Sequence, residues 1–345
     1  MNTSTAFSRR AFLSMAGGAF GAAALGLAGC GGGSVASGSS SDGLIEVKFG
    51  VSLWPSVMLY FLAAEKGIDK ENGIKLSATQ FNGTTDSNNA LVGGQIDFTN
   101  YPSPETIAPF SQGAPLKVVL LDDKSNGCEG IVSKPEIETV QDLKGKTICT
   151  QLYSADHMLL LTLLRDNGMS EDDVKIVDMT IQESSNAFIA GQCDAASVWD
   201  PYFTEAKNAG GNVLYSTADN PDIITDCLVT RSDVIEKNPK AVQGIVDTYF
   251  ATIDWWNKNK DEGSAFMGEL LGTDAAGFEA QMEGLTLPTP ESAVKAFTPA
   301  DDYTYWGYTQ NVIRDFMYDL KQIDNKPDCA EMIDDTFVKA ALKKA

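Results

Sequence analysis

The chain has 345 residues, with 47 acidic and 26 basic side chains and a net charge of −21 at pH 7. This acidity excludes nucleic acid as a partner, because nucleic-acid binding requires a basic surface. It favours a soluble, monomeric protein, and the length is sufficient for two lobes of ordinary domain size.

The first thirty residues predict an export signal. Arg9 and Arg10 precede a glycine-rich apolar run over residues 15–28. This arrangement is typical of a secretory signal, whereas a membrane-spanning helix needs about 20 apolar residues. The paired arginines resemble a twin-arginine signal, and residues 27–30 resemble a bacterial lipobox in which Cys30 is lipidated. We therefore expect the chain at the cell membrane, lipid-anchored on the extracytoplasmic face.

Residues 31–43 are almost entirely Gly, Ser and Ala, which predicts a flexible tether. From residue 44 onward, short apolar runs alternate with helical segments that end at glycine, a pattern typical of βα units. The expected strands are 47–53, 74–81, 96–100 and 116–121, and the expected helices are 57–66, 86–92 and 104–112.

The alternating pattern restarts after residue 123 and becomes helical after about residue 230. Pro239 begins a helix whose apolar residues recur with a period of 3.6. Residues 306–323 repeat this pattern. The second set of expected strands is 130–133, 146–151, 174–179, 194–199 and 212–216, with helices at 155–167, 184–190 and 202–208.

Two α/β units and a helical C-terminal section predict two lobes, each built on a mostly parallel sheet and joined by two chain crossings. We expect lobe I at residues 44–123 and 228–345, and lobe II at residues 124–227. Ligands of such sheets bind beyond the carboxyl ends of the strands. Two lobes that face each other there would form a cleft that closes by hinge motion.

The loops after the predicted strands combine aromatic rings and hydroxyl groups with helix starts. Backbone N–H groups at helix starts bind polar or anionic groups, and aromatic walls suit a small ligand. For any single polar residue the alternative is an ordinary helix N-cap, and for a tryptophan it is a core position. The candidate ligand-binding residues are Trp54, Thr84, Thr85, Tyr101, Ser103, Ser125, Tyr153, Ser154, Glu183, Trp199 and Asp200.

Sequence motifs for catalysis or metal binding are absent. No GxSxG elbow, Walker loop, HExxH or dinucleotide fingerprint occurs. The single histidine, His157, would need a nucleophile and an orienting partner to act as a base, so a packed structural role is favoured. The five cysteines after Cys30 lack CxxC spacing; we expect buried small hydrophobic residues, with any pairing left open. No catalytic residue, cofactor or metal is expected.

Several phrases of the sequence resemble the family of nitrate, sulfonate and taurine solute-binding proteins, which includes carriers of thiamine pyrimidine precursors. The resemblance covers about residues 47–231 firmly, and the helical remainder loosely. It implies a type II periplasmic-binding fold, a small ligand in the interlobe cleft, and an ABC permease and ATPase as partners. The phrases include Trp54-Pro55, Gly94-Gln95-Ile96-Asp97, Asp123-Lys124-Ser125-Asn126-Gly127, Asp142-Leu143-Lys144-Gly145-Lys146, Asp194-Ala195-Ala196 and Trp199-Asp200-Pro201-Tyr202.

The predicted cleft loops are acidic, which bears on the class of ligand. Their one base is Lys124, and helix N-termini, each equivalent to about half a positive charge, could still hold a sulfonate. A taurine-like zwitterion or a polar heterocycle is therefore favoured over nitrate or another simple inorganic anion. The acids of these loops are Asp86, Glu105, Asp123, Glu129, Asp156, Glu183 and Asp200.

Two other functions stay open. Single-turnover pyrimidine-precursor synthases share the family resemblance, but they are associated with a cysteine-rich CCCFC-type motif, and this chain has no clustered cysteines. A sensory module that presents its ligand to a membrane receptor would have the same sequence features as a transporter component.

Overall fold

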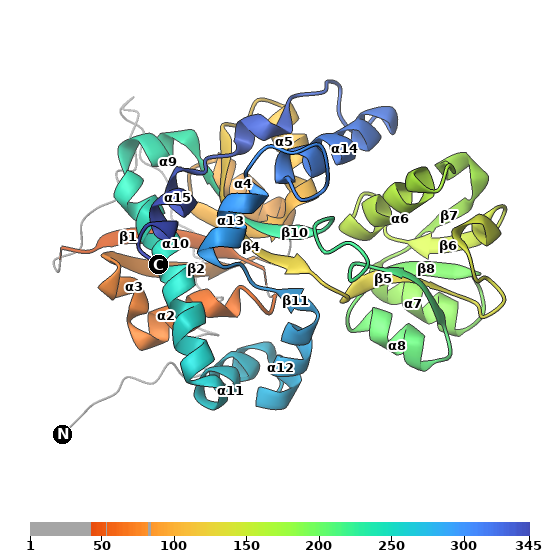
Figure 1. The fold of residues 1–345 in the computed structure, drawn as a ribbon, viewed down its shortest axis with the longest axis horizontal. Helices are drawn as coiled ribbons and strands as arrows, with labels where there is room; N and C mark the ends of the chain where they lie inside the picture. Colours follow the sequence, from red (N-terminus) through yellow and green to blue (C-terminus); the bar gives the residue numbers. More distant parts are fainter. Residues whose placement is uncertain (1–42, 53, 82–83) are drawn as a thin grey trace, which may run out of the picture.

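The computed structural model describes residues 43–52, 54–81 and 84–345, and these form two lobes side by side (Figure 1). Each lobe contains a β-sheet covered by helices, which confirms the predicted two-lobed α/β fold. The predicted signal with Cys30, and the predicted tether as far as residue 42, lie outside the described residues.

Lobe I contains a six-stranded sheet with the order β11-β4-β10-β3-β1-β2. Strand β1 is parallel to β2 and β3, whereas β10 is antiparallel to β3 and β4, and β11 is antiparallel to β4. The bounds are β1 (Ile45–Val51), β2 (Ile74–Gln80), β3 (Phe98–Pro102), β4 (Leu116–Ser125), β10 (Thr225–Arg231) and β11 (Leu285–Thr286).

Lobe II contains a five-stranded sheet with the order β7-β6-β8-β5-β9. Strand β6 is parallel to β7 and β8, and β5 is antiparallel to β8 and β9. The bounds are β5 (Glu129–Ser133), β6 (Thr147–Thr150), β7 (Lys175–Asp178), β8 (Ala195–Trp199) and β9 (Asn212–Ser216).

Both sheets are mixed, and in each of them most strands run in one direction, as expected. The strands that run against the others are β10 and β11 in lobe I and β5 in lobe II. The chain reaches β5 and β10 directly from the other lobe, without the long and usually helical crossover that joins parallel strands. No strand was expected over residues 225–231, because every residue of β10 is buried and a fully buried strand shows no polar alternation.

Helices cover both sheets. Helix α10 (Pro239–Lys258) starts at the predicted proline, which can occupy the first helical position because the N–H there has no intrahelical partner. The other helices of lobe I are α2 (Met58–Lys66), α3 (Ile68–Glu71), α4 (Thr84–Val92), η1 (Ser103–Thr106), α5 (Ile107–Ser111), α9 (Ser232–Lys237), α11 (Lys260–Leu271), α12 (Ala275–Glu283), α13 (Pro290–Ala296), α14 (Trp306–Asp319), η4 (Cys329–Met332) and α15 (Thr336–Leu342). Those of lobe II are η2 (Val140–Leu143), α6 (Ala155–Asp166), η3 (Glu171–Asp173), α7 (Ile181–Ile189) and α8 (Tyr202–Asn208).

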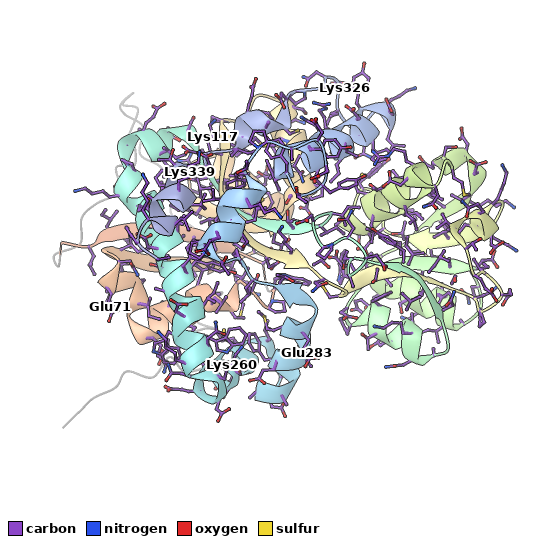
Figure 2. The ribbon with its side chains drawn as sticks, in the orientation of Figure 1. Glu71, Lys117, Lys260, Glu283, Lys326 and Lys339 are labelled. Carbon is purple, nitrogen blue, oxygen red and sulfur yellow. The ribbon has the colours of Figure 1, made fainter. Side chains whose placement is uncertain are left out.

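The outer surface of lobe I carries much charge. Figure 2 shows charged side chains that project outward from its helices and loops, among them Glu71, Lys117 and Glu283. In the part of the chain that the structure describes, no helix has both the length and the apolar character needed to cross a membrane.

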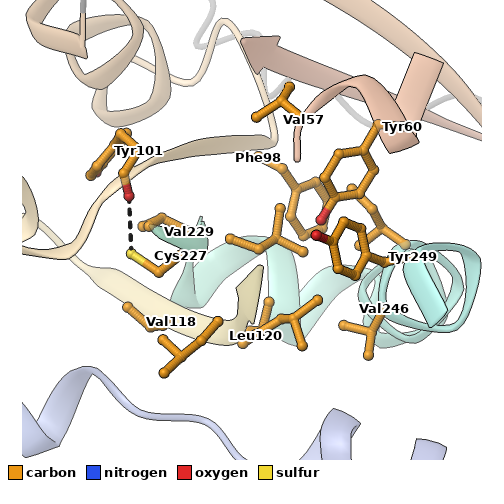
Figure 3. Close-up of a cluster of buried hydrophobic side chains, with 14 of the residues drawn as sticks. Val57, Tyr60, Phe98, Tyr101, Val118, Leu120, Cys227, Val229, Val246 and Tyr249 are labelled. Carbon is orange, nitrogen blue, oxygen red and sulfur yellow. Dashed lines mark hydrogen bonds between the residues drawn. The ribbon is translucent and has the colours of Figure 1, made fainter. Parts of the chain in front are cut away.

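The core of lobe I encloses a polar group among apolar side chains. The rings of Tyr60 and Tyr249 lie 5.0 Å apart between their centroids (Figure 3). The Tyr249 hydroxyl donates a hydrogen bond to the Asp122 backbone oxygen at 2.6 Å, and the Tyr60 hydroxyl donates to Asp122 Oδ1 at 3.3 Å. Asn100 donates to the other carboxyl oxygen. Burial raises the pKa of Asp122 well above its usual range, which favours the protonated form of this carboxyl group.

All five cysteines of the described residues are buried and free of disulfide bonds, which confirms the expectation of small hydrophobic residues. Cys227 Sγ donates a hydrogen bond to the Tyr101 backbone oxygen at 3.5 Å (Figure 3). The cysteines are Cys128, Cys149, Cys193, Cys227 and Cys329.

Two chain segments, residues 125–129 and 216–225, connect the lobes. They are hydrogen-bonded to each other: the hydroxyls of Ser125 and Thr217 lie 2.6 Å apart, and Gly127 N–H donates to Thr217 Oγ1 at 2.8 Å. Two such short, paired connections are typical of a hinge. Strand β4 runs past residue 123 and β10 begins before residue 228, and the lobe limits of the sequence analysis stay a prediction.

The lobes also meet at α6 and α14. Arg165 at the end of α6 donates to the hydroxyl of Tyr303, and that hydroxyl donates to Asp166 Oδ2 at 3.1 Å. The Arg165 guanidinium lies 5.2 Å from the ring centroid of Phe316 on α14. We call this group of contacts the α6–α14 contact.

Candidate functional site: the interlobe cleft

A cavity of about 1350 Å³ lies between the lobes. Residues at or just beyond the carboxyl ends of β1 and β3 line it from lobe I, together with α4, α5 and the end of α14. From lobe II, residues after β6 and at the end of β8 line it together with α6. This is the place where α/β sheets bind ligands, and the volume is ample for a small organic molecule.

Aromatic residues from both lobes face this cavity. Trp54 and Tyr101 line it from lobe I, and Tyr153 and Trp199 line it from lobe II. The other sequence-predicted residues that line it are Thr85 and Ser154. Six of the candidate ligand-binding residues are thus brought together around one cavity.

Two of the aromatic residues are held by hydrogen bonds to polar neighbours. Trp54 Nε1 donates to Asp123 Oδ2 at 3.0 Å, which fixes the indole at the wall of the cleft. The Tyr101 hydroxyl donates to Asn88 Oδ1 at 3.2 Å, and Asn88 also lines the cavity. Sequence reasoning missed Asn88 because it lies inside α4 rather than in a loop after a strand.

The loop before α6 presents Tyr153 to the cleft. Its φ angle is +70°, a conformation that costs a non-glycine residue about 1 kcal/mol or more, and its side chain is 59% exposed. His157 Nδ1 accepts the Tyr153 N–H at 3.2 Å, and Ser154 caps the helix by accepting the His157 N–H at 3.3 Å. Burial lowers the pKa of His157 to about 4. His157 therefore holds the loop as a neutral structural residue.

Ser103 and Ser125 do not line the cavity. Ser103 is fully buried; its hydroxyl accepts the indole N–H of Trp306 at 3.0 Å and bonds to the Thr225 backbone oxygen at 2.6 Å. Ser125 lies in one of the two segments that connect the lobes, and its hydroxyl is hydrogen-bonded to that of Thr217. The hydroxyls of Ser103 and Ser125 therefore both bond to other parts of the protein.

Glu183 and Asp200 do not line the cavity either. Glu183 forms a capping box with Thr180, whose hydroxyl donates to Glu183 Oε2 at 2.8 Å. Asp200 Oδ1 accepts the N–H of Thr204 in the first turn of α8 at 2.8 Å. Both satisfy N–H groups that helix starts leave unpaired. Thr84 begins α4, and its side chain lies outside the described part of the structure.

Replacing Ser103 with alanine is expected to destabilise the protein by about 1–3 kcal/mol, because the buried indole N–H of Trp306 loses its acceptor. Urea unfolding measures this loss. Ser111→Ala is a matched control, since its hydroxyl bonds only to Ala108 O within α5. Unchanged stability together with weaker ligand binding would place Ser103 in the binding site instead.

The charged residues of the cleft are mainly acidic. Glu105, Glu129 and Asp226 line the cavity. Asp226 was missed because no strand was expected there. Of the described residues that line the cavity, only Lys321 carries a positive charge, and the base identified from sequence, Lys124, pairs with Asp222 instead.

Burial raises the pKa values of the acids in and behind the cleft. The pKa of Glu129 lies well above its usual range because of burial and the nearby charges of Asp156 and Asp123. Burial, with the charges of Asp123 and Glu129, likewise raises the pKa of Asp226. Burial raises the pKa of Asp123 to about 6 and that of Asp156 to about 8. Within the described residues, no group of His, Cys, Asp and Glu has a metal-binding arrangement.

Known proteins share this architecture. The crystal structure of the periplasmic aliphatic sulphonate binding protein SsuA from Escherichia coli aligns with a TM-score of 0.69 at 24% identity, over 84% of this chain and 97% of that chain. The two lobes and the cleft thus define a type II periplasmic-binding-protein fold with a helical C-terminal section.

Residues 54–262 match the family described as NMT1/THI5 like. The chain belongs to this family. A Bacillus subtilis relative named for binding aliphatic sulfonates is 27% identical over 328 residues, which are 92% of this chain and 94% of that protein. The taurine-binding periplasmic protein of Escherichia coli is 27% identical over 248 residues, 68% of this chain and 76% of that protein.

Proposed function

We propose that the chain is the extracytoplasmic solute-binding component of an ABC importer. It captures a small sulfonate, zwitterion or polar heterocycle in the interlobe cleft and delivers it to an ABC permease and ATPase. The observation that carries this proposal is the cleft itself, with aromatic walls from both lobes at the strand ends. The names of the sulfonate-binding and taurine-binding relatives support it.

Capture proceeds by hinge closure about the two segments that connect the lobes, residues 125–129 and 216–225. Trp54 and Trp199 line the cavity from opposite lobes, so closure brings an aromatic face to each side of a ligand. Closure also removes water from the cleft, and this strengthens every polar contact made there. Burial of apolar ligand surface between the two faces supplies the non-specific part of the affinity.

The anchor belongs to the same proposal. Lipidation at Cys30 would hold the monomeric protein at the extracytoplasmic face of the cell membrane. Residues 31–43 would serve as the tether that lets the two lobes reach solute while the anchor stays in the membrane. Metabolic labelling with a palmitate analogue, lost in Cys30→Ser, tests the anchor. Unchanged labelling of that variant would contradict it.

An enzymatic role has less support. The pyrimidine-synthase alternative consumes a reactive histidine, whereas His157 is 1% exposed and its Nδ1 already accepts the Tyr153 N–H. We propose no catalytic residue. Loss of His157 on incubation with pyridoxal phosphate, followed by mass spectrometry, would favour the enzyme.

A thermal-shift screen of the purified full chain tests the binding function directly. The panel holds sulfonates, nitrate, amino acids, polyamines and pyrimidines. A ligand at 100 times its dissociation constant should stabilise the protein by about 2.7 kcal/mol. The absence of a shift with every compound would contradict the proposal.

Trp199→Ala is expected to weaken binding of the active compound by about tenfold or more, because one aromatic wall of the cleft is lost. Isothermal titration calorimetry measures the change. Trp255→Ala is the control, since Trp255 does not line the cavity and its ring lies under Lys66, 5.1 Å from Nζ. Equal affinity of the Trp199 variant and the wild type would move the site away from this wall.

A further inference from the structure

We propose that the ligand is recognised through a cationic nitrogen, an ammonium or amidinium, that binds between Glu129 of lobe II and Asp226 of lobe I. This inference rests on the proposed function and narrows its ligand classes to cations and zwitterions. It is carried by an unpartnered buried carboxylate oxygen at the cavity wall and by a second buried acid facing the same cavity from the other lobe.

Glu129 lies in the wall of the cavity, and one of its two carboxyl oxygens forms no hydrogen bond. It is the first residue of β5, is 6% exposed, and lines the cavity. Its Oε2 atom has no hydrogen-bond partner. A buried polar atom without a partner is costly, so an oxygen in this position at a cavity wall indicates a donor supplied by the ligand.

Asp226 meets the same cavity from lobe I and is 7% exposed. It lies directly opposite Asp123 in the antiparallel pairing of β10 and β4, so both side chains emerge on one face of the sheet. Like charges in such a pair repel each other. Trp54 donates to Asp123, but no basic side chain among the described residues forms an ion pair with either acid.

The acids of the cleft region form no ion pair with a described residue, and this includes Lys321, the base that lines the cavity. In the part of the chain that the structure describes, no ion pair includes Asp122, Asp123, Glu129, Asp156 or Asp226. Both carboxyl oxygens of Asp156 are also without partners. A positive ligand group would supply the missing charge.

Aromatic side chains suit the same group. Trp54, Tyr153 and Trp199 line the cavity with the acids, and indole and phenol faces attract cations. Glu129 and Asp226 lie at the starts of β5 and β10, directly after the two segments that connect the lobes. A cation held by both would therefore draw the lobes together and couple binding to hinge closure.

Three matched pairs of probes separate charge from size: taurine and isethionate, putrescine and 1,4-butanediol, and benzamidine and benzamide. Each pair keeps its skeleton and replaces the cationic nitrogen with a neutral group. Calorimetry on the purified full chain is expected to show that at least one cationic member binds about tenfold or more tightly than its partner. Binding of the neutral-group members alone, or equal binding within every pair that binds, would overturn the inference.

Glu129→Gln and Asp226→Asn are each expected to reduce the affinity for the cationic probe by about tenfold or more, with Glu205→Gln on the exposed face of α8 as control. In the free state at pH 8 the same two variants should melt at a higher temperature than wild type, because an unpaired buried acid is removed. A purely structural role would lower the melting temperature. Unreduced affinity in both variants would overturn the inference.

The outcomes also separate this inference from the proposed function. If the broad screen finds ligands but the matched pairs show no preference for positive charge, the solute-binding function stands and the cation site is wrong. If no compound in either set binds, both are contradicted.

Discussion

The free protein is expected to lose stability steeply as the pH rises from about 4 to about 8.5. Asp123, with a pKa of about 6, and Asp156, with a pKa of about 8, hold protons in the folded state that they release in the unfolded state. Over this range the unfolded chain binds fewer protons, so the free energy of unfolding falls as pH rises. The stabilisation that each acid contributes is complete below its pKa in the unfolded chain. It is lost as the pH rises through its pKa in the folded protein.

The expected change in the free energy of unfolding over this pH range amounts to several kcal/mol. A pKa difference of one unit corresponds to about 1.4 kcal/mol, so Asp123 alone accounts for about 3 kcal/mol and Asp156 for more. Urea unfolding at several pH values measures the slope. Asp156→Asn should flatten it, and Asp172→Asn on the exposed surface should not. A stability that is constant from about pH 4 to about pH 8.5 would show that these acids ionise normally.

Gly130→Ala is expected to destabilise lobe II by about 3 kcal/mol. A Cβ atom at this position would lie 2.5 Å from the Tyr215 backbone oxygen and 2.6 Å from the Phe203 ring. The oxygen belongs to the neighbouring strand β9 and the ring is 1% exposed. Neither can move without separating β5 from its neighbours.

Because Gly130 follows Glu129 directly, the same substitution should also abolish ligand binding. Urea unfolding followed by calorimetry measures both effects. Ile131→Val is the comparison, since it removes one buried methyl group of the same strand and should cost about 1 kcal/mol. An unchanged unfolding midpoint for Gly130→Ala would mean that β5 and β9 have room for the added methyl group.

The parts of the fold that could be predicted from sequence are those whose signal is local. Helix α10 was predicted from its proline and its apolar period, and α6 from a helix start followed by a nearly continuous apolar run. Strand β10 could not be found in this way. Its burial depends on β3 and β4 lying on either side of it, and that arrangement is a property of the tertiary fold.

The candidate site shows the same division. Trp54, Tyr153 and Trp199 line the cleft because aromatic residues after buried strands emerge at one edge of a sheet. Glu183 and Asp200 also lie close after predicted strands, yet they cap helices. The same polar side chains at such positions can either cap a helix or contact a ligand, so residue type and position do not distinguish the two roles. Asp226 was missed together with its strand.

The α6–α14 contact has a consequence for how affinities in this protein compare. It joins the lobes through Arg165, Tyr303 and Phe316, none of which lines the cavity. It therefore favours molecules in which the lobes are already together, whatever the ligand. The apparent dissociation constant equals the intrinsic one divided by the fraction of competent molecules. The contact therefore scales the affinity for every solute by one common factor and leaves the order of preference among solutes to the cleft.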